Sequence, residues 1–207
     1  MSSRPNLFIV AAPSGGGKTS LVAALLERDR GVRLSISHTT RAPRPGERNG
    51  EHYHFVDEAT FLQLISKNAF LEYAQVYGHY YGTGRAPVKQ LLDEGFNVML
   101  DIDWQGARQV KASFPGCCSI YILPPSMQEL RARLARRGQD SPDVIESRMQ
   151  EARSEIAHCR EFDFLVINNA FDAALDDLLS IVRVGQPVRG GTKEGIETLL
   201  ADLLKNV

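Results

Sequence analysis

The chain has 207 residues, of which 43% are hydrophobic and 24% are charged, values that suit one α/β domain with a small insertion. Its formal net charge of −1 excludes the broad positive field expected of a protein that binds nucleic acid or an anionic membrane surface. No run approaches the roughly 18 apolar residues needed to span a bilayer, so we expect neither nucleic acid nor a membrane as a partner.

The cysteines and the N-terminal residues both indicate a reducing compartment. Cys117, Cys118 and Cys159 form no CxxC pair, and an odd number of cysteines cannot be fully paired in disulfides. The apolar run at residues 7–12 is shorter than the core of a secretory signal. We therefore expect a soluble, cytoplasmic protein.

The first predicted elements are a buried strand at residues 7–11, a glycine-rich loop and a helix at 19–27. The loop fits the pattern G-x-x-x-x-G-K-[ST], with Ala12 at the first position. Its glycines let consecutive backbone N–H groups surround a polyphosphate at a helix N-terminus. Lys18 can reach the terminal phosphates, and the Thr19 hydroxyl can ligate Mg²⁺. The predicted triphosphate-binding residues are Ala12, Pro13, Ser14, Gly15, Gly16, Gly17, Lys18, Thr19 and Ser20.

Residues 37–84 interrupt the alternation of strands and helices. This block is rich in Arg, Pro, Gly, His and Tyr, with short alternating runs at 52–56 and 70–77. It predicts an inserted lobe of small strands that receives a second substrate. Arg41 and Arg44 lie three residues apart in a proline-stiffened loop, and paired guanidinium groups suit a monophosphate dianion.

Further polar residues support the prediction of a second substrate site. Tyr53 and Tyr81 offer phenolic donors to the same phosphate, and Glu72 lies on a mostly apolar strand where a carboxylate needs a purpose. Asp101 and Asp103 alternate at the end of a strand predicted at 97–103, where ligands of open α/β sheets gather. Each residue also has an ordinary structural explanation, such as Asp103 capping the next helix, so the hypothesis depends on their combination.

The remaining elements alternate in the manner of a parallel sheet covered by helices. Further strands are predicted at 119–123 and 164–168, and helices at 86–94, 104–114, 127–136, 143–158 and 173–182. After a glycine- and proline-containing linker, an apolar stripe at helical spacing predicts a C-terminal helix. This helix either docks on the chain's own core or contacts another subunit, and its stripe comprises Ile196, Leu199, Leu200, Leu203 and Leu204.

At these positions the chain strongly resembles the guanylate kinase family. The resemblance covers about residues 5–184 in the family's order. Besides the phosphate loop it includes residues 37–47, Gly50-Glu51-His52-Tyr53, Phe70-Leu71-Glu72, Tyr80-Tyr81-Gly82-Thr83, Leu100-Asp101-Ile102-Asp103, Leu123-Pro124-Pro125-Ser126, Arg136-Arg137-Gly138 and Val166-Ile167-Asn168-Asn169.

The resemblance implies an α/β P-loop NTPase fold, with a parallel sheet flanked by helices, an inserted α+β GMP-binding lobe and a helical lid. It places a kinase domain at 4–184, with the core at 4–36, 85–125 and 160–184, the lobe at 37–84 and the lid at about 126–159. Residues 185–207 would be the linker and a helix through which a homo-oligomer could form.

The resemblance also implies transfer of the γ-phosphoryl group of ATP to GMP, with dGMP as a further possible acceptor and Mg²⁺ bound with ATP. Arg41, Arg44, Tyr53 and Tyr81 would bind the GMP phosphate, and Ser37, Glu72, Thr83 and Asp103 would recognise guanine. Lys18, Arg41, Arg137 and Arg148 would be catalytic. Asn168 would contact ATP, with Asn169 where the family often has Asp, and Thr19 and Asp101 would serve the metal.

Guanine also suits these residues on chemical grounds. Its pairing edge offers N1–H and N2–H₂ donors and an O6 acceptor, which match carboxylates at Glu72 and Asp103 and hydroxyls at Ser37 and Thr83. Two alternatives remain open: a P-loop kinase with another acceptor, and a non-enzymatic guanylate-kinase-like interaction module. An intact Lys18 and Thr19 in a short chain disfavour the second.

Overall fold

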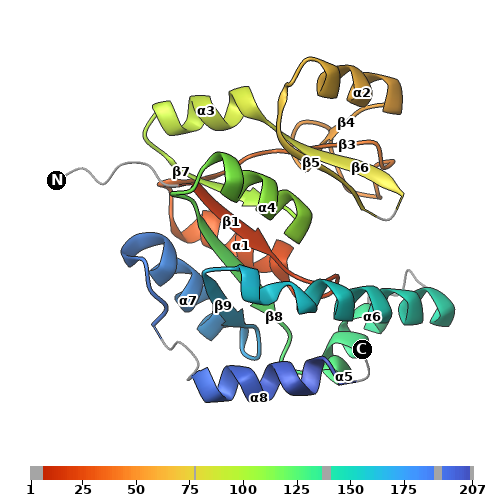
Figure 1. Ribbon diagram of the computed structural model, residues 1–207, viewed down its shortest axis with the longest axis vertical. Coiled ribbons are helices and arrows are strands. Elements are labelled where there is room, and N and C mark those ends of the chain that lie inside the picture. The colour runs from red at the N-terminus through yellow and green to blue at the C-terminus, as the bar shows by residue number, and fades with distance from the viewer. Residues whose placement is uncertain (1–6, 77, 137–140, 189–192, 206–207) are drawn as a thin grey trace. The chain divides into compact units, whose positions relative to one another are not determined.

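The computed structural model describes residues 7–76, 78–136, 141–188 and 193–205 (Figure 1). Its larger sheet has the strand order β2-β7-β1-β8-β9, and β2 pairs with β7, and β8 with β9, in parallel. Helices flank this sheet, so the predicted α/β fold class is confirmed. The strands are β1 (Leu7–Ala11), β2 (Val32–Leu34), β7 (Asn97–Asp101), β8 (Cys118–Leu123) and β9 (Phe164–Ile167).

The chain divides into two compact units. The first comprises Met1–Ile9 and Gly31–Cys118, and the second comprises Val10–Arg30 and Ser119–Val207. The first unit therefore contains the whole block at 37–84, whereas the second contains the glycine-rich loop.

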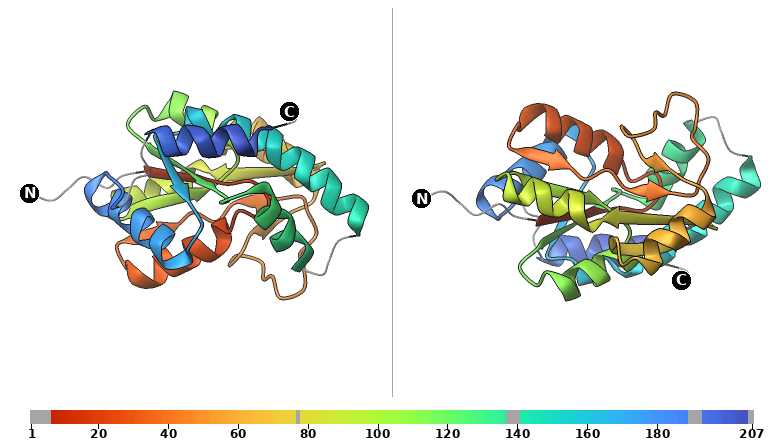
Figure 2. Two further views of the ribbon diagram at one scale, coloured as in Figure 1. Left: turned by 90° about the horizontal axis from the view of Figure 1, so that it is seen from below. Right: turned by 90° about the horizontal axis from the view of Figure 1, so that it is seen from above.

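A second, four-stranded sheet in the first unit has the order β4-β3-β6-β5 and carries helix α2, as Figures 1 and 2 show from three directions. The side chain of Phe61, on α2, is fully buried, and its ring stacks on those of Phe70, at 4.5 Å, and Tyr80, at 5.3 Å. Helix α2 was missed by the sequence analysis, although Asp57 caps it by accepting from the Thr60 N–H. The elements are β3 (His38–Thr39), β4 (His54–Phe55), α2 (Glu58–Ser66), β5 (Phe70–Val76) and β6 (His79–Gly84).

The same unit contains helices α3 (Arg85–Asp93) and α4 (Trp104–Ser113). The strand predicted at 97–103 is wrong at its end, because β7 stops at Asp101. Asp103 instead caps α4, where its Oδ1 accepts from the Gly106 N–H at 2.9 Å. Asp101 and Asp103 therefore do not alternate along one strand.

Helices dominate the second unit. Helices α5 and α6 pack through Leu130, Leu134, Met149 and Ala152, and α1 contacts α7. Ser141 caps α6 and Pro142 is its first residue, a pairing typical of helix starts. The bounds are α1 (Lys18–Arg28), α5 (Met127–Arg136), α6 (Pro142–Ala157), the 3₁₀ turn η1 (Cys159–Glu161) and α7 (Phe171–Val184).

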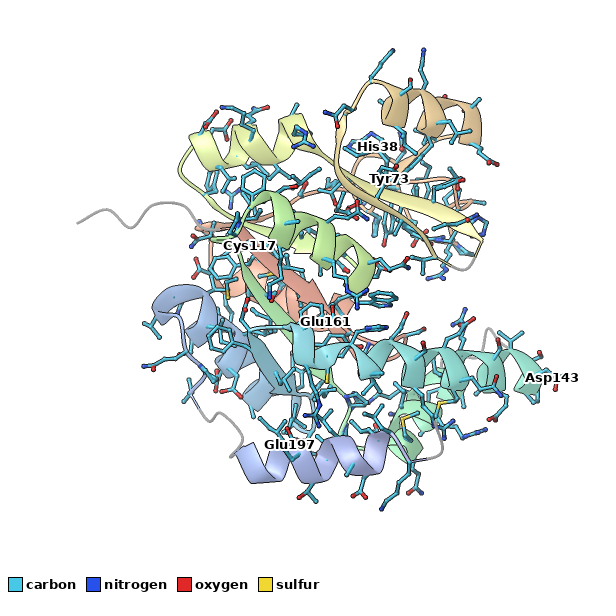
Figure 3. The ribbon with its side chains drawn as sticks, viewed as in Figure 1. His38, Tyr73, Cys117, Asp143, Glu161 and Glu197 are labelled. Carbon is cyan, nitrogen blue, oxygen red and sulfur yellow. The ribbon has the colours of Figure 1, made fainter. Side chains whose placement is uncertain are left out.

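The predicted C-terminal helix is α8 (Lys193–Leu203). Leu200 and Leu203 of its apolar stripe are each 1% exposed within the single chain. Glu197, labelled in Figure 3, pairs with Arg160 of η1. Part of the stripe therefore docks on the chain's own second unit. In the described residues, no helix is both long enough and apolar enough to cross a bilayer.

Candidate functional site

The glycine-rich loop of the second unit has the turn geometry that its sequence predicts. The Gly16 N–H donates to the Pro13 carbonyl at 2.8 Å, and Gly15 and Gly17 have φ values of 88° and 91°. Such values favour glycine strongly. Ala12 is not among the residues with positive φ, which explains why a side chain is tolerated there.

Helix α1 begins at Lys18, directly after the loop. Lys18 is half-buried, whereas Thr19 and Ser20 are exposed in the first turn. The exposed first-turn hydroxyls and N–H groups of this helix are suitable groups for binding an anion and its metal.

Asn168 holds the loop just before the start of α1. Its buried amide Nδ2 donates to the Gly16 carbonyl at 2.9 Å. A Cβ at Gly17 would lie only 2.3 Å from the same nitrogen, so only glycine fits there. The structure thus places Asn168 on the phosphate loop, while its predicted contact with ATP stays a prediction.

Two residues beside this loop were missed by the sequence analysis. Arg133 donates from Nη2 to the Asn168 carbonyl at 3.0 Å and from Nε to Glu129 at 2.9 Å. Glu155, on α6, accepts from the Ser14 N–H at 3.3 Å. Glu129 and Arg133 lie four residues apart on one helix, and this spacing predicts their ion pair. No local sequence pattern links Arg133 or Glu155 to the loop.

The predicted lid arginines are only partly described. Arg148 is half-buried on α6. Arg137 lies outside the described residues, as does the segment at 138–140.

The first unit brings together Arg41, Tyr53 and Tyr81, three of the four residues predicted to bind the acceptor phosphate. The guanidinium of Arg41 lies 5.6 Å from the ring centre of Tyr53, whose ring meets that of Tyr81 edge-on at 5.9 Å. Burial alone lowers the pKa of Arg41, but hydrogen bonds to Glu47 and Tyr81 outweigh it and leave that pKa raised. Arg44, the fourth residue, is exposed at the tip of the same loop.

Three of the residues predicted to recognise guanine form one buried hydrogen-bonded chain. The Thr83 hydroxyl donates to Glu72 Oε1 at 2.6 Å and lies 3.1 Å from the Ser37 hydroxyl. Ser37, Glu72 and Thr83 are 7%, 3% and 0% exposed. The antiparallel pairing of Glu72 with Thr83 in β5 and β6 produces this contact.

Glu72 has an unusual protonation equilibrium for a glutamate. Burial raises its pKa to about 7, the hydrogen bond from Thr83 opposes that rise, and the negative charge of Asp103 adds to it. Near neutral pH the carboxyl group therefore exists in both protonated and ionised forms. A ligand that donates hydrogen bonds to the carboxylate would favour the ionised form.

Asp103 is held in place by its neighbours on α4. Its Oδ1 accepts from the Gly106 N–H, and its Oδ2 accepts from Gln105 Nε2 at 3.0 Å. Gly106 also makes room for Glu72, because a Cβ there would lie 2.4 Å from Glu72 Oε2. Gln109, three residues further along, bonds both backbone groups of Tyr73, which is labelled in Figure 3 and follows Glu72 in the chain. The sequence analysis missed these supporting residues of α4.

The two predicted metal residues lie in different units, Thr19 in the second and Asp101 in the first. Both offer hard oxygen donors, which Mg²⁺ prefers. Within the described part of the chain, no three His, Cys, Asp or Glu side chains form a metal-binding group. Each residue alone therefore offers one oxygen-donor group, which suits an ion that would take most of its ligands from a bound triphosphate and water.

Sequence comparison identifies the family. The guanylate kinase family profile matches residues 4–184 of this chain. The chain belongs to the guanylate kinase family. It is 53% identical over 205 residues to the guanylate kinase of Shewanella oneidensis, covering 99% of each chain. It is 54% identical to that of Shewanella violacea, covering 98% of this chain and 100% of the other.

A solved structure agrees with this membership. The crystal structure of guanylate kinase from Anaplasma phagocytophilum is similar with a TM-score of 0.73 and 32% identity. The matched region covers 96% of this chain and 95% of the Anaplasma phagocytophilum chain. The resemblance noted in the sequence is therefore confirmed for the family, and the described site residues occupy two local clusters of one guanylate kinase chain.

Proposed function

We propose that the protein transfers the γ-phosphoryl group of ATP to GMP, giving ADP and GDP. The observation that carries the choice of acceptor is the buried chain of Ser37, Thr83 and Glu72 in a member of the guanylate kinase family. We further propose that residues 37–84 are the GMP-binding lobe and that 126–159 form the lid. The GDP produced would supply guanine nucleotide synthesis.

Guanine fits this cluster because its donors face carboxylates. N1–H and N2–H₂ would donate to Glu72 and Asp103, and the Ser37 hydroxyl can turn from Thr83 to donate to O6, while Thr83 keeps its bond to Glu72 and so orients that carboxylate. Adenine would present its N1 lone pair to a carboxylate and leave buried polar groups unpaired. A site of this kind can reject the wrong base by about 10⁴-fold.

The phosphate of GMP would bind at the cluster of Arg41 and Tyr81 with Tyr53. Arg41 offers a planar fork of N–H donors that matches two phosphate oxygens, and Arg44 at the loop tip adds a second positive charge. dGMP lacks only the 2′-hydroxyl, so the same contacts would accept it as well.

ATP would bind at the glycine-rich loop, where backbone N–H groups and Lys18 face the phosphates. Mg²⁺ arriving with ATP would neutralise phosphate charge, with the Thr19 hydroxyl as a ligand and Asp101 as a further oxygen group. Arg148 and Arg137 would approach the transferring group from the lid.

Phosphoryl transfer requires alignment of the two substrates rather than covalent catalysis by the protein. A GMP phosphate oxygen attacks the γ-phosphorus, the bond from that phosphorus to the β–γ bridging oxygen breaks, and ADP leaves. The attacking phosphate is already ionised, so no general base is required. Lys18 and the arginines stabilise the charge of the transition state, and a closed lid excludes water as a competing acceptor.

An acceptor panel tests this proposal. The purified protein with ATP and Mg²⁺ is assayed for ADP formation with GMP, dGMP, AMP, CMP and UMP. We expect efficient turnover of GMP and AMP turnover lower by about 10⁴-fold in kcat/KM. Comparable rates with AMP would contradict the guanine assignment, and GMP binding without turnover would favour a non-enzymatic interaction module.

A further inference from the structure

Glu47 lies at the centre of the loop that carries Arg41 and Arg44. Its Oε1 accepts from Arg41 Nη2 at 2.9 Å, and its Oε2 accepts from the backbone N–H of Arg44 at 2.7 Å. Its own N–H donates to the Arg44 carbonyl at 3.0 Å. One carboxylate therefore holds the guanidinium of one arginine and the backbone of the other.

This pair is largely shielded from water. The side chains of Arg41 and Glu47 are 12% and 17% exposed, whereas the Arg48–Glu51 pair in the same unit is 73% and 53% exposed. Burial raises the pKa of Glu47, but hydrogen bonds from Arg41 and Arg44 outweigh it and lower that pKa. Glu47 therefore stays ionised at neutral pH, and its attraction for Arg41 is less screened than that of a surface pair.

Glu47 also decides which donors of Arg41 are left for a ligand. Nη2 donates to Glu47 and Nη1 donates to the Ala42 carbonyl at 2.7 Å. Because the guanidinium group is planar, these two bonds, together with the hydrogen bond to Tyr81, fix its orientation and leave its remaining N–H groups in set directions. An arginine without such partners must lose its side-chain freedom when the ligand binds, which weakens binding.

We infer that Glu47 is a positioning residue for the acceptor phosphate: it orders Arg41 and the Arg44 backbone before GMP arrives. This inference rests on the proposed function, because it takes the Arg41 cluster as the site of the GMP phosphate. Glu47 is itself an anion and would repel a phosphate rather than bind it. Its effect is exerted through the arginines.

Glu47→Gln is the sharpest test, because the amide has nearly the same shape as the carboxylate but only one acceptor oxygen. Its NH₂ group must face either Arg41 Nη2 or the Arg44 N–H, so one of the two bonds is lost. We expect the KM for GMP to rise about tenfold, with kcat and the KM for ATP within about twofold of wild type. Glu47→Asp keeps both acceptor oxygens on a shorter stem and should lose less than Glu47→Gln.

Guanosine separates positioning of the phosphate site from collapse of the lobe. It carries the base of GMP without the phosphate, so its inhibition constant against GMP should be unchanged in Glu47→Gln. Glu51→Gln is the matched control, since Glu51 pairs with an arginine at the exposed surface of the same unit. We expect wild-type kinetics for this control.

The outcomes are distinct. An unchanged KM for GMP in Glu47→Gln overturns the inference, and so does an equal loss of guanosine and GMP binding, which would show a structural role. A wild-type protein that fails to phosphorylate GMP overturns the proposed function itself, and the inference with it, before any variant is compared.

Discussion

The phosphate loop and the proposed acceptor lobe would recognise their ligands in different ways. The loop is one stretch, residues 12–19, whose backbone N–H groups would do most of the binding in the proposed function, and its geometry depends on glycine. The lobe uses side chains from a loop, from β5 and β6 and from the start of α4. Backbone recognition is compact in sequence, whereas recognition of a base requires side chains that only tertiary pairing assembles.

The two regions also differ in how they are held. The loop is braced from outside, by the Asn168 amide on the Gly16 carbonyl and by Glu155 on the Ser14 N–H. The lobe is held by its own carboxylates, with Glu47 on Arg41 and Glu72 on Thr83. Substitutions in the two regions should therefore separate ATP effects from GMP effects.

Lys18→Ala is expected to have the largest effect. It removes the side chain proposed to stabilise phosphate charge in the transition state, and we expect kcat to fall about 10³-fold or more with the fold intact. Steady-state kinetics measure the loss, and circular dichroism checks the fold. Lys89→Ala serves as the control, because Lys89 forms an exposed pair with Asp93. Near-normal turnover of Lys18→Ala would refute the assignment of the phosphate loop.

Arg41→Lys is expected to have the next largest effect, and it should act on the acceptor. Lysine keeps the charge but loses the planar fork that pairs with two phosphate oxygens. We expect kcat/KM for GMP to fall about 10- to 100-fold, equivalent to about 1.4–3 kcal/mol.

The matched control for Arg41→Lys is Arg48→Lys, in which the arginine lies at the exposed surface beside Glu51. ATP affinity should barely change in either variant. A defect of Arg41→Lys that lies mainly in ATP affinity would contradict the separation of the two regions.

Features that depend on contiguous residues could be predicted from the sequence, whereas features assembled by tertiary contacts could not. The glycine loop and Lys18 were predictable because the motif is contiguous, and helix ends were close because capping is local. The strand predicted at 97–103 was two residues too long. The alternation of Asp101 and Asp103 resembles the pattern of a strand, but Asp103 caps α4. Helix α2 went unrecognised inside a block whose composition indicated strands.

Supporting residues were the hardest to foresee. Glu155 bonds the phosphate-binding loop, and Arg133 bonds Asn168 beside it, only because helices far from the loop in sequence pack there. Gln109 bonds Tyr73 across 36 residues, and Gly106 is required by the position of Glu72. None of these has a sequence pattern, because each depends on which partner the fold brings near.

Acidic pH should weaken recognition of guanine by about fivefold between pH 7 and pH 6. In the proposed site guanine binds ionised Glu72, whose pKa is about 7 without ligand, so affinity is at its maximum well above pH 7 and falls as the carboxyl group takes up a proton. Guanosine is the right probe, because it has no phosphate that titrates in this range. Calorimetry or inhibition constants from pH 5.5 to 8.5 measure the effect.

Glu72→Gln is the comparison for that prediction and should bind guanosine weakly at every pH. Stability supplies an independent readout of the same group. Because the folded pKa is raised above the ordinary value of 4.5, the stability that Glu72 contributes relative to glutamine is present below about pH 4.5 and lost as pH rises through 7. The loss should reach about 3 kcal/mol. If the difference in unfolding free energy between the wild type and Glu72→Gln did not vary with pH, the raised pKa of Glu72 would be excluded.

Asn168→Ala should have the smallest effect, and it should act on ATP alone. Losing the hydrogen bond to the buried Gly16 carbonyl costs about 1 kcal/mol, so we expect the KM for ATP to rise about fivefold with the KM for GMP unchanged. Bracing of the loop predicts equal weakening of inorganic tripolyphosphate, measured as a competitive inhibitor of ATP, because that anion binds the same backbone groups without an adenine. Asn169→Ala, at the exposed neighbouring position, is the control. Weakening of ATP with unchanged tripolyphosphate binding would instead assign Asn168 to the adenine ring, and the geometry of the loop would then be shown not to depend on the Asn168 amide.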